Sequence, residues 1–154
     1  MSRFRICLAC ALPPEEAWRR VLDLRAHGAV LPLTTVLGER LAADDLRAGD
    51  RFVARTAIGP LRLDDAMLVE AIVPPGQGRP GHARIRKQGR AVRGWIELRV
   101  AASAYGSTVD WRQEIAVWGV PRLAGPVTAA VARLAYRAAL RRLLARDGPA
   151  PMAP

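Results

Sequence analysis

The stretch RAVRGWIELRVAASAYGSTVDWRQEIAVW, residues 90–118, alternates apolar and polar side chains through most of its length. Alternation with a period of two is typical of β-strands, because successive side chains point to opposite faces of a sheet. Ala104-Tyr105-Gly106 interrupts the pattern with turn residues. The stretch therefore predicts two long strands, 90–100 and 107–118, joined as an antiparallel hairpin.

The same period extends toward the N-terminus and predicts a sheet of seven strands. Turn residues such as Ala48-Gly49-Asp50 and Gly59-Pro60 separate the segments. The separations are too short for crossover helices, so we expect antiparallel pairing throughout. A first strand alternates from Arg3 to Leu12, and the other predicted strands are Leu33–Leu41, Arg51–Ile58, Leu61–Val73 and Ala83–Lys87.

Two regions have helical spacing instead. Pro13-Pro14-Glu15-Glu16 is a typical helix start, since proline fits the first turn and acidic side chains favour the positive end of the helix dipole. We expect a short helix or a helix pair here, ending near Pro32. The second region, 127–146, predicts one long helix rich in Ala, Leu and Arg.

The apolar pattern of this long helix drifts between two nearly opposite faces. One face carries Val127, Val131, Leu134 and Ala138. The other carries Tyr136, Leu140, Leu143 and Leu144. We expect the first face to cover the sheet and the second to pack elsewhere or on a partner, so the protein is expected to be a monomer or a homodimer.

Composition indicates a single globular domain. The chain has 154 residues, of which 51% are hydrophobic, so it is too short for two ordinary domains and too apolar to be disordered. We expect one domain over residues 1–147 and a disordered tail over 148–154, where Gly and Pro are frequent. No apolar run approaches the roughly 20 residues that a membrane-spanning helix needs.

The sequence offers no metal or cofactor motif. Cys7 and Cys10 lie three apart on a predicted strand, and such positions face opposite ways. No second cysteine pair or nearby histidine completes a metal site. The chain also lacks a phosphate loop, a dinucleotide fingerprint and an HExxH motif. We therefore expect structural thiols, no cofactor and a cytoplasmic location.

The order of strand, helix pair, six antiparallel strands and long C-terminal helix is that of the helix-grip fold. Over residues 3–146 the chain resembles the START-like superfamily, also called SRPBCC, which includes polyketide cyclase/dehydrase-type and birch-pollen-allergen-like proteins. The residues that carry the resemblance are Pro13-Pro14-Glu15-Glu16-Ala17-Trp18 with Asp23, Gly49-Asp50-Arg51-Phe52, Ile58-Gly59-Pro60-Leu61, Pro74-Pro75, Gly89-Arg90-Ala91-Val92-Arg93-Gly94 and Thr108-Val109-Asp110-Trp111-Arg112-Gln113-Glu114.

The resemblance implies an α+β fold in which a curved seven-stranded antiparallel sheet wraps around the last helix. It also implies an apolar cavity between the sheet and that helix. Members of the superfamily bind lipids, steroids, polyketides or similar molecules there, and only some of them catalyse a reaction. They share no catalytic residue set, so the resemblance leaves enzymatic activity open.

Alternation predicts which strand residues face such a cavity, Ala71 among them. Thr56, Asp65, Lys87 and Gln113 are polar residues on this otherwise apolar inner face. Asp65 and Lys87, the single lysine, should lie on neighbouring strands, which predicts a direct ion pair between them. They either form an anchor or acid/base pair for a ligand, or reach solvent near the strand ends. The predicted ligand-binding residues are Thr56, Asp65, Met67, Ile85, Lys87, Trp111, Gln113, Val131 and Leu134.

The expected function is binding of a small hydrophobic ligand, such as a lipid or a polyketide, with cyclase- or dehydratase-like activity left open. His27, at a predicted helix break, is either a gate or proton-transfer group or an ordinary loop histidine. The alternative is an interaction module that docks an acidic protein or nucleic acid, because the net charge is +10 and residues 121–154 hold six Arg against Asp147 alone. Nucleic acid is disfavoured, since the basic segments lack interleaved aromatic residues. Carriage of a lipid or a quinone near membranes, helped by the positive surface, is a third expectation.

Overall fold

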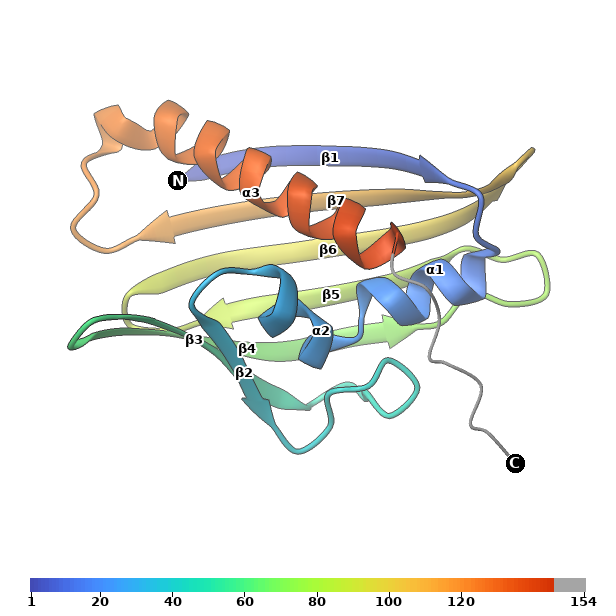
Figure 1. Ribbon diagram of the computed structural model, residues 1–154, viewed down its shortest axis with the longest axis horizontal. Helices are drawn as coiled ribbons and strands as arrows, with labels where there is room; N and C mark the ends of the chain where they lie inside the picture. Colours follow the sequence, from blue (N-terminus) through green and yellow to red (C-terminus); the bar gives the residue numbers. More distant parts are fainter. Residues whose placement is uncertain (146–154) are drawn as a thin grey trace.

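The computed structural model describes residues 1–145, which form an antiparallel sheet with three α-helices on one side of it (Figure 1). The seven strands are ordered β1-β7-β6-β5-β4-β3-β2, so β1 and β2 are the two edges. The helices are α1 (Pro14–Val21), α2 (Leu24–Val30) and α3 (Gly125–Ala145). The strands are β1 (Ser2–Cys10), β2 (Thr34–Gly38), β3 (Arg51–Ile58), β4 (Leu61–Val73), β5 (Gly81–Gln88), β6 (Val92–Ser103) and β7 (Gly106–Val117).

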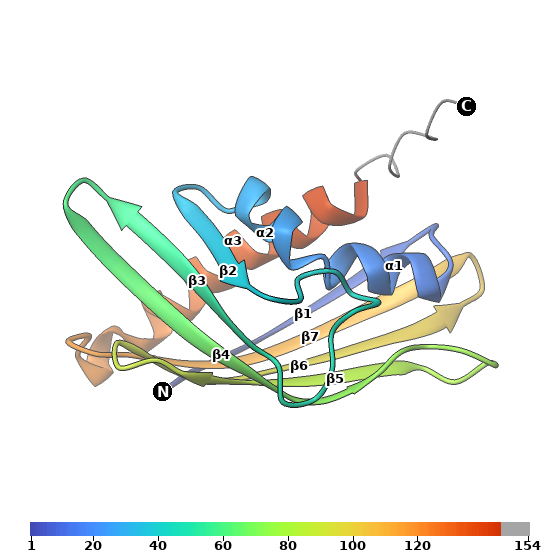
Figure 2. The same cartoon turned by 90° about the horizontal axis from the view of Figure 1, so that it is seen from below.

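This architecture confirms the predicted α+β helix-grip fold. Figure 2 shows that the sheet is curved, with α3 lying diagonally across its concave side and β3 and β4 rising beside it. The predicted bounds of β3 and β4 are those observed, and the turn between β5 and β6 falls at Gly89–Ala91. The predicted domain end at residue 147 and the predicted tail, 148–154, lie outside the described residues.

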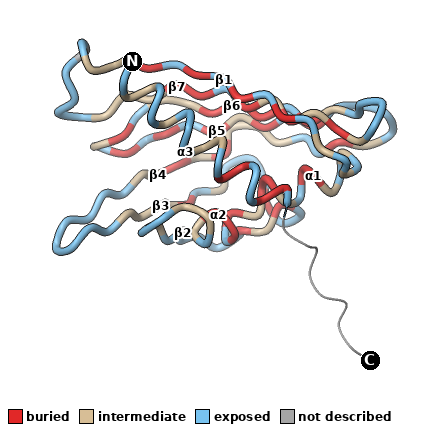
Figure 3. The backbone as a smooth tube through the Cα atoms, turned by 45° about the horizontal axis from the view of Figure 1, so that its top comes forward, coloured by how far each residue is buried: buried red, intermediate tan, exposed pale blue. Residues whose placement is uncertain are grey.

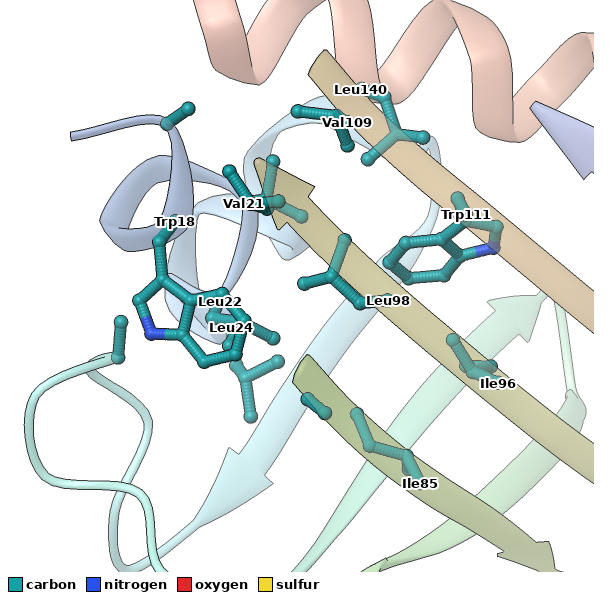
Figure 4. Packing of buried hydrophobic residues seen from close by; sticks show 14 of the residues in the cluster. Trp18, Val21, Leu22, Leu24, Ile85, Ile96, Leu98, Val109, Trp111 and Leu140 are labelled. Carbon is teal, nitrogen blue, oxygen red and sulfur yellow. The ribbon is translucent and has the colours of Figure 1, made fainter. Parts of the chain in front are cut away.

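The helix pair closes one end of the concave face. Pro14 begins α1 with Glu15 and Glu16 in its first turn, and the Asp23 side chain caps α2 by accepting a hydrogen bond from the Ala26 amide at 3.3 Å. Apolar residues of both helices then reach the sheet, where Figure 4 shows them against β5 and β6. The buried residues at this contact include Trp18, Val21, Leu22, Leu24, Ile85 and Leu98.

The long helix packs on the face that was predicted to point away from the sheet. Ala139, Leu140, Leu143 and Leu144 are buried, and Tyr136 is partly buried against the core. Val127, Val131 and Leu134, predicted to cover the sheet, are instead 67%, 61% and 69% exposed. Small residues explain the reversal: Ala132 packs against the core, which lets this half of α3 lie close to β1 without a large apolar side chain.

A β-bulge in β4 corrects one predicted face. The register shifts between Val69, which pairs with Ile85, and Ala71, which pairs with Arg84. One extra residue reverses the alternation, so Ile72 pairs with the buried Ala83 and packs against the core. The predicted inward position of Ala71 is therefore wrong.

Burial is uneven along the sheet. Figure 3 shows that the buried residues concentrate where β1, β5, β6 and β7 lie under the helices, whereas the turn that joins β3 to β4 is exposed. The inner face of this hairpin carries Ile58, Leu61 and Leu63, by alternation from Phe52 and Met67. These three side chains are 62%, 73% and 40% exposed. An apolar strip of the concave face thus continues beyond the part of the sheet that the helices cover.

Candidate ligand-binding site

A cavity lies between the concave face of the sheet and the three helices. Its free volume is about 50 Å³, which is room for a few water molecules, since one water needs roughly 10–15 Å³ on this measure. The lining is almost wholly apolar and comes from all the surrounding elements. It consists of Val21, Leu22, Leu24, His27, Leu31, Val36, Phe52, Ala54, Met67, Ile85, Ile96, Trp111 and Tyr136.

A buried ion pair lies directly beside this cavity. The Lys87 side chain has no exposed area, and its Nζ contacts Asp65 Oδ2 and lies 3.8 Å from the Sδ of the cavity residue Met67. Alternation along β5 turns Lys87 inward, where its cross-strand neighbours are Met67 and Gly94. The Asp65 side chain keeps 15% exposure. The predicted ion pair is therefore present, and Lys87 does not reach solvent.

The environment of the pair shifts both pKa values upward. Burial raises the pKa of Asp65 above its ordinary value, because desolvation outweighs the opposing effect of the Lys87 charge. Burial alone would lower the pKa of Lys87, but interactions with Tyr136 and Asp65 outweigh it and raise that pKa. Lys87 thus stays protonated at neutral pH. It can act as a fixed positive charge or hydrogen-bond donor, and it is unsuited to act as a free amine.

Two buried polar atoms near the cavity have no partner among the described residues. These are Asp65 Oδ1, an acceptor, and Gln113 Nε2, a donor. Gln113 is fully buried, and its Oε1 accepts a 3.0 Å hydrogen bond from Nε1 of the cavity residue Trp111. Unsatisfied buried polar groups are costly, so atoms of this kind are expected to meet a ligand or water. Asp65 Oδ1 needs a donor, and a hydroxyl group would supply one.

Aromatic rings form one wall of the cavity. Trp111 on β7 lies between His27 and Tyr136, with ring centroids 6.4 Å and 5.6 Å away. Phe4 on β1 continues the row, 5.9 Å from Tyr136. A continuous aromatic wall favours a ligand that is flat or apolar, because its faces can pack on the rings.

His27 lies inside α2 and is buried, which corrects its predicted place at a helix break. Its Nε2 donates a 2.7 Å hydrogen bond to the Val21 carbonyl oxygen. Burial lowers the pKa of His27, with the hydrogen bond to Val21 and the charge of Asp23 opposing the shift. The imidazole is therefore neutral at pH 7, and it serves as a wall of the cavity.

The structure brings together most, but not all, of the predicted site residues. Met67, Ile85 and Trp111 line the cavity, Lys87 and Asp65 lie beside it, and Gln113 lies behind Trp111. Thr56 lies farther along β3, where its hydroxyl group is 3.0 Å from that of Thr34. Val131 and Leu134 are exposed on α3, so their prediction as lining residues is corrected. Tyr136 takes that place, being in helical phase with the buried Leu140 and Leu143.

Other kinds of site have less support in this part of the chain. Residues 1–145 contain no group of three or more His, Cys, Asp or Glu side chains that could hold a metal ion. Within the same residues, no helix is both long and apolar enough to cross a bilayer. Cys7 and Cys10 are free and lie on β1, as predicted, with Cys7 exposed.

Solved structures with the same architecture cover nearly all of this chain. A protein from Chromobacterium violaceum is 18% identical, with a TM-score of 0.67 and coverage of 94% of this chain and 96% of its own. A START superfamily protein from Mycobacterium smegmatis is 14% identical, with a TM-score of 0.64 and coverage of 94% of each chain. The di-domain ARO/CYC protein StfQ of the steffimycin biosynthetic pathway is 12% identical, with a TM-score of 0.68 over 93% of this chain and 49% of its own.

These likenesses bear on the fold alone, because the sequence identities are low. No protein-family model and no curated protein sequence matches the chain. The likeness nevertheless covers 93% to 94% of this chain, whose sheet, helix pair and α3 enclose the cavity. The chain therefore has the START-like, or SRPBCC, helix-grip fold.

Proposed function

We propose that this protein binds a small, largely apolar molecule that carries a hydroxyl group. The observation that carries the proposal is an apolar, aromatic-walled cavity beside a buried ion pair whose second carboxylate oxygen, Asp65 Oδ1, is buried and has no partner among the described residues. Apolar pockets with a few well-placed polar groups are the usual form of small-molecule sites. The START superfamily and ARO/CYC names of two structural neighbours agree with this class of ligand.

The size of the site indicates how the ligand would lie. The free volume of about 50 Å³ is too small for a ligand that fills the roughly 300–1,000 Å³ of ordinary pockets. The uncovered inner face of the β3–β4 hairpin, with Leu63, Leu61 and Ile58, provides further apolar surface. We therefore place the flat end of the ligand against Trp111 and Tyr136 and let any longer apolar part follow the hairpin.

The ion pair would fix the polar end of the ligand. Asp65 Oδ1 would accept a hydrogen bond from the ligand hydroxyl group, and Lys87 would keep the carboxylate charged. In cyclase- or dehydratase-like chemistry the Lys87 ammonium group would stabilise an oxyanion formed beside it. We propose binding and leave catalysis open. We expect the protein to bind its ligand in the cytoplasm.

Calorimetric titration with 2-naphthol and with naphthalene tests the proposal. Both probes match the apolar lining, and only 2-naphthol can donate a hydrogen bond to Asp65. We expect 2-naphthol to bind with a stoichiometry of one and about tenfold or more tighter than naphthalene, since a buried acceptor discriminates strongly against a ligand that lacks the donor. Equal affinity for the two probes, or no binding of either, would contradict the proposal.

Two substitutions on one strand show where the probe binds. Ala54→Leu adds apolar volume to the cavity wall, whereas Ala57→Leu adds the same atoms at an exposed position of the same strand. We expect the first variant to lose 2-naphthol binding and the second to keep it. Loss of binding in both variants, or in neither, would place the probe outside the cavity.

A further inference from the structure

Large apolar side chains are exposed along the segment from the end of β7 to the middle of α3. Trp118 is 84% exposed and Leu123 is 95% exposed, and both lie in the connection before α3. Val127, Val131 and Leu134 follow on the helix, each more than 60% exposed. We call these five residues the docking face. Exposed apolar patches of this kind usually mark an interaction surface.

Helix geometry shows why the sheet cannot bury the three docking-face residues of α3. At 100° per residue, Val127, Val131 and Leu134 form one stripe, and Ala132, Tyr136 and Leu143 lie on the opposite side of the helix. The second set packs on the core and on the sheet edge β1. The stripe therefore points outward from the folded domain and is available to a partner.

The charged residues of the chain segment that carries the docking face are all positive. Between Glu114 and Asp147 the sequence contains no acidic residue. Arg133, Arg137 and Arg141 follow one another at intervals of four along the helix, and no ion pair involves them within residues 1–145. An apolar stripe beside such a row of arginines is the pattern of a helix that lies on an anionic membrane surface.

A second copy of the chain fits this surface poorly. Face-to-face association would place arginine rows near one another, and neither copy has an acidic residue on this segment to compensate them. The docking face needs a partner that offers anionic groups to the arginines and an apolar layer to the stripe. A bilayer with anionic headgroups has both, namely its phosphate groups and its acyl chains. An exposed tryptophan such as Trp118 is also well suited to the boundary between headgroups and acyl chains.

The position of the docking face relates it to the ligand site. Figures 1 and 2 show that the β7–α3 connection and the β3–β4 turn lie at the same end of the molecule. The β3–β4 turn carries the exposed Ile58 and Leu61, at the end of the hairpin's inner face that lies farthest along the strands from the cavity residues Ala54 and Met67. The backbone fixes the connection there, since the Trp118 amide donates a 2.8 Å hydrogen bond to the Ala91 carbonyl oxygen.

We propose that the docking face binds the surface of a membrane containing anionic lipids. This contact would place near the bilayer the tip of the proposed ligand groove, by which we mean the cavity together with the inner hairpin residues Leu63, Leu61 and Ile58. The relation to the groove rests on the proposed function, whereas the membrane contact does not. The docking face inserts its apolar side chains at the headgroup boundary, and Arg133, Arg137 and Arg141 contact phosphates.

Vesicle co-sedimentation of the full chain tests the contact. We expect binding to vesicles of phosphatidylcholine with about one third phosphatidylglycerol, and much weaker binding to phosphatidylcholine alone. Leu123→Ser/Val131→Ser/Leu134→Ser should weaken binding at least about tenfold. Arg133→Gln/Arg137→Gln/Arg141→Gln should weaken it by roughly fivefold per arginine, or about a hundredfold in total.

Matched controls use exposed residues away from the docking face. Tyr105→Ser removes a side chain that is 91% exposed in the β6–β7 turn, at the other end of the molecule. Arg51→Gln/Arg99→Gln removes exposed arginines of β3 and β6. Both controls should bind vesicles like the parent protein. Brominated acyl chains should quench the emission of the parent protein, and this quenching should be lost in Trp118→Phe, which keeps Trp18, Trp95 and Trp111.

Three results would overturn the membrane proposal. The first is absence of binding to the anionic vesicles. The second is equal binding to polyglutamate with no effect of the apolar triple variant, which would indicate a surface for acidic proteins. The third is a dimer in analytical ultracentrifugation that the same triple variant dissociates.

Calorimetry with 2-naphthol separates this proposal from the proposed function. The apolar triple variant should keep 2-naphthol binding while losing vesicle binding, because none of its three positions lines the cavity. Ala54→Leu should lose 2-naphthol binding and keep vesicle binding. Vesicle binding without probe binding would leave the membrane contact standing and remove the ligand site.

Discussion

Lys87 and Asp65 form a salt bridge across β4 and β5 with the lysine side chain wholly buried. The contact is diagonal, because the residue directly opposite Lys87 is Met67. Such a pair fixes a charge in an apolar interior, where its effect on a ligand is greater than at a wet surface. Each charge also needs the other, because a buried charge without its partner would lower the stability of the fold.

Removing one member of this pair should be more damaging than removing both. Lys87→Met leaves the Asp65 carboxylate buried without its cation, and we expect a loss of about 3–5 kcal/mol in the free energy of unfolding. Lys87→Met/Asp65→Leu replaces the pair with apolar side chains and should recover most of that loss. Urea denaturation of the two single variants and the double variant measures the coupling. A double variant as unstable as the sum of the single variants would show that the two residues act independently.

Burial of His27 should make stability depend on pH below neutrality. Its pKa is lowered in the folded protein, so the unfolded chain, with a pKa of about 6.5, takes up a proton first. Stability is therefore complete above about pH 6.5 and falls as the pH drops toward the folded-state pKa, by at most about 1.4 kcal/mol per pH unit. Thermal denaturation at several pH values between about 7 and 5 measures the slope.

His27→Gln is the control for that slope. Glutamine keeps an N–H group for the Val21 carbonyl and does not titrate, so the variant should lose most of the dependence. A parent protein whose stability is constant across this range would contradict the assignment of a lowered pKa.

The orientation of α3 can be tested with two leucines of the same helix. Leu140 is 1% exposed and Leu134 is 69% exposed. Leu140→Ala should cost about 2–5 kcal/mol in the free energy of unfolding, whereas Leu134→Ala should change it by less than about 0.5 kcal/mol. Chemical denaturation of both variants gives the comparison. Equal losses would mean that the helix packs on both faces.

Gly81 should tolerate no side chain. A Cβ atom at this position would lie 2.6 Å from Pro75 Cδ and 2.7 Å from the Trp18 ring, both in the region where α1 meets the sheet. Gly81→Ala should therefore lower the free energy of unfolding by about 1–3 kcal/mol through overpacking. Gly76, in the loop before β5, provides the control, because a Cβ atom there would have nothing within 4 Å. A Gly81→Ala variant as stable as Gly76→Ala would refute the close packing.

Much of the fold could be predicted because the sheet repeats a simple rule. Alternation alone placed Lys87, Ile85 and Trp111 on the inner face, and burial confirms all three. The rule failed at Ala71, since a bulge adds one residue to β4 and nothing in the local sequence distinguishes it from continuous alternation. The sequence could predict that Asp65 and Lys87 lie close together on neighbouring strands. It could not predict that Lys87 is fully buried, because that depends on how far the helices extend over the strands.

The orientation of α3 could not be predicted from its sequence. Two apolar stripes of similar weight lie on opposite sides of this helix, and hydrophobicity favours the Val127–Val131–Leu134 stripe in its first half. The structure selects the stripe with small Ala132, because close approach to β1 requires it. The role of Tyr136 in the cavity follows from that choice, so the sequence could not reveal it.

The exposed tip of the β3–β4 hairpin is a place where the length of the chain can change without loss of packing. A Cβ atom at Gly59 would have nothing within 4 Å, and its neighbours Ile58 and Leu61 are mostly bare, so the tip is free of the packing that holds the domain together. Adding or deleting residue pairs there would change the length of guest molecule that the groove accommodates. Under the proposed function, the size of the accepted molecule and the stability of the domain would therefore be set by separate parts of the chain.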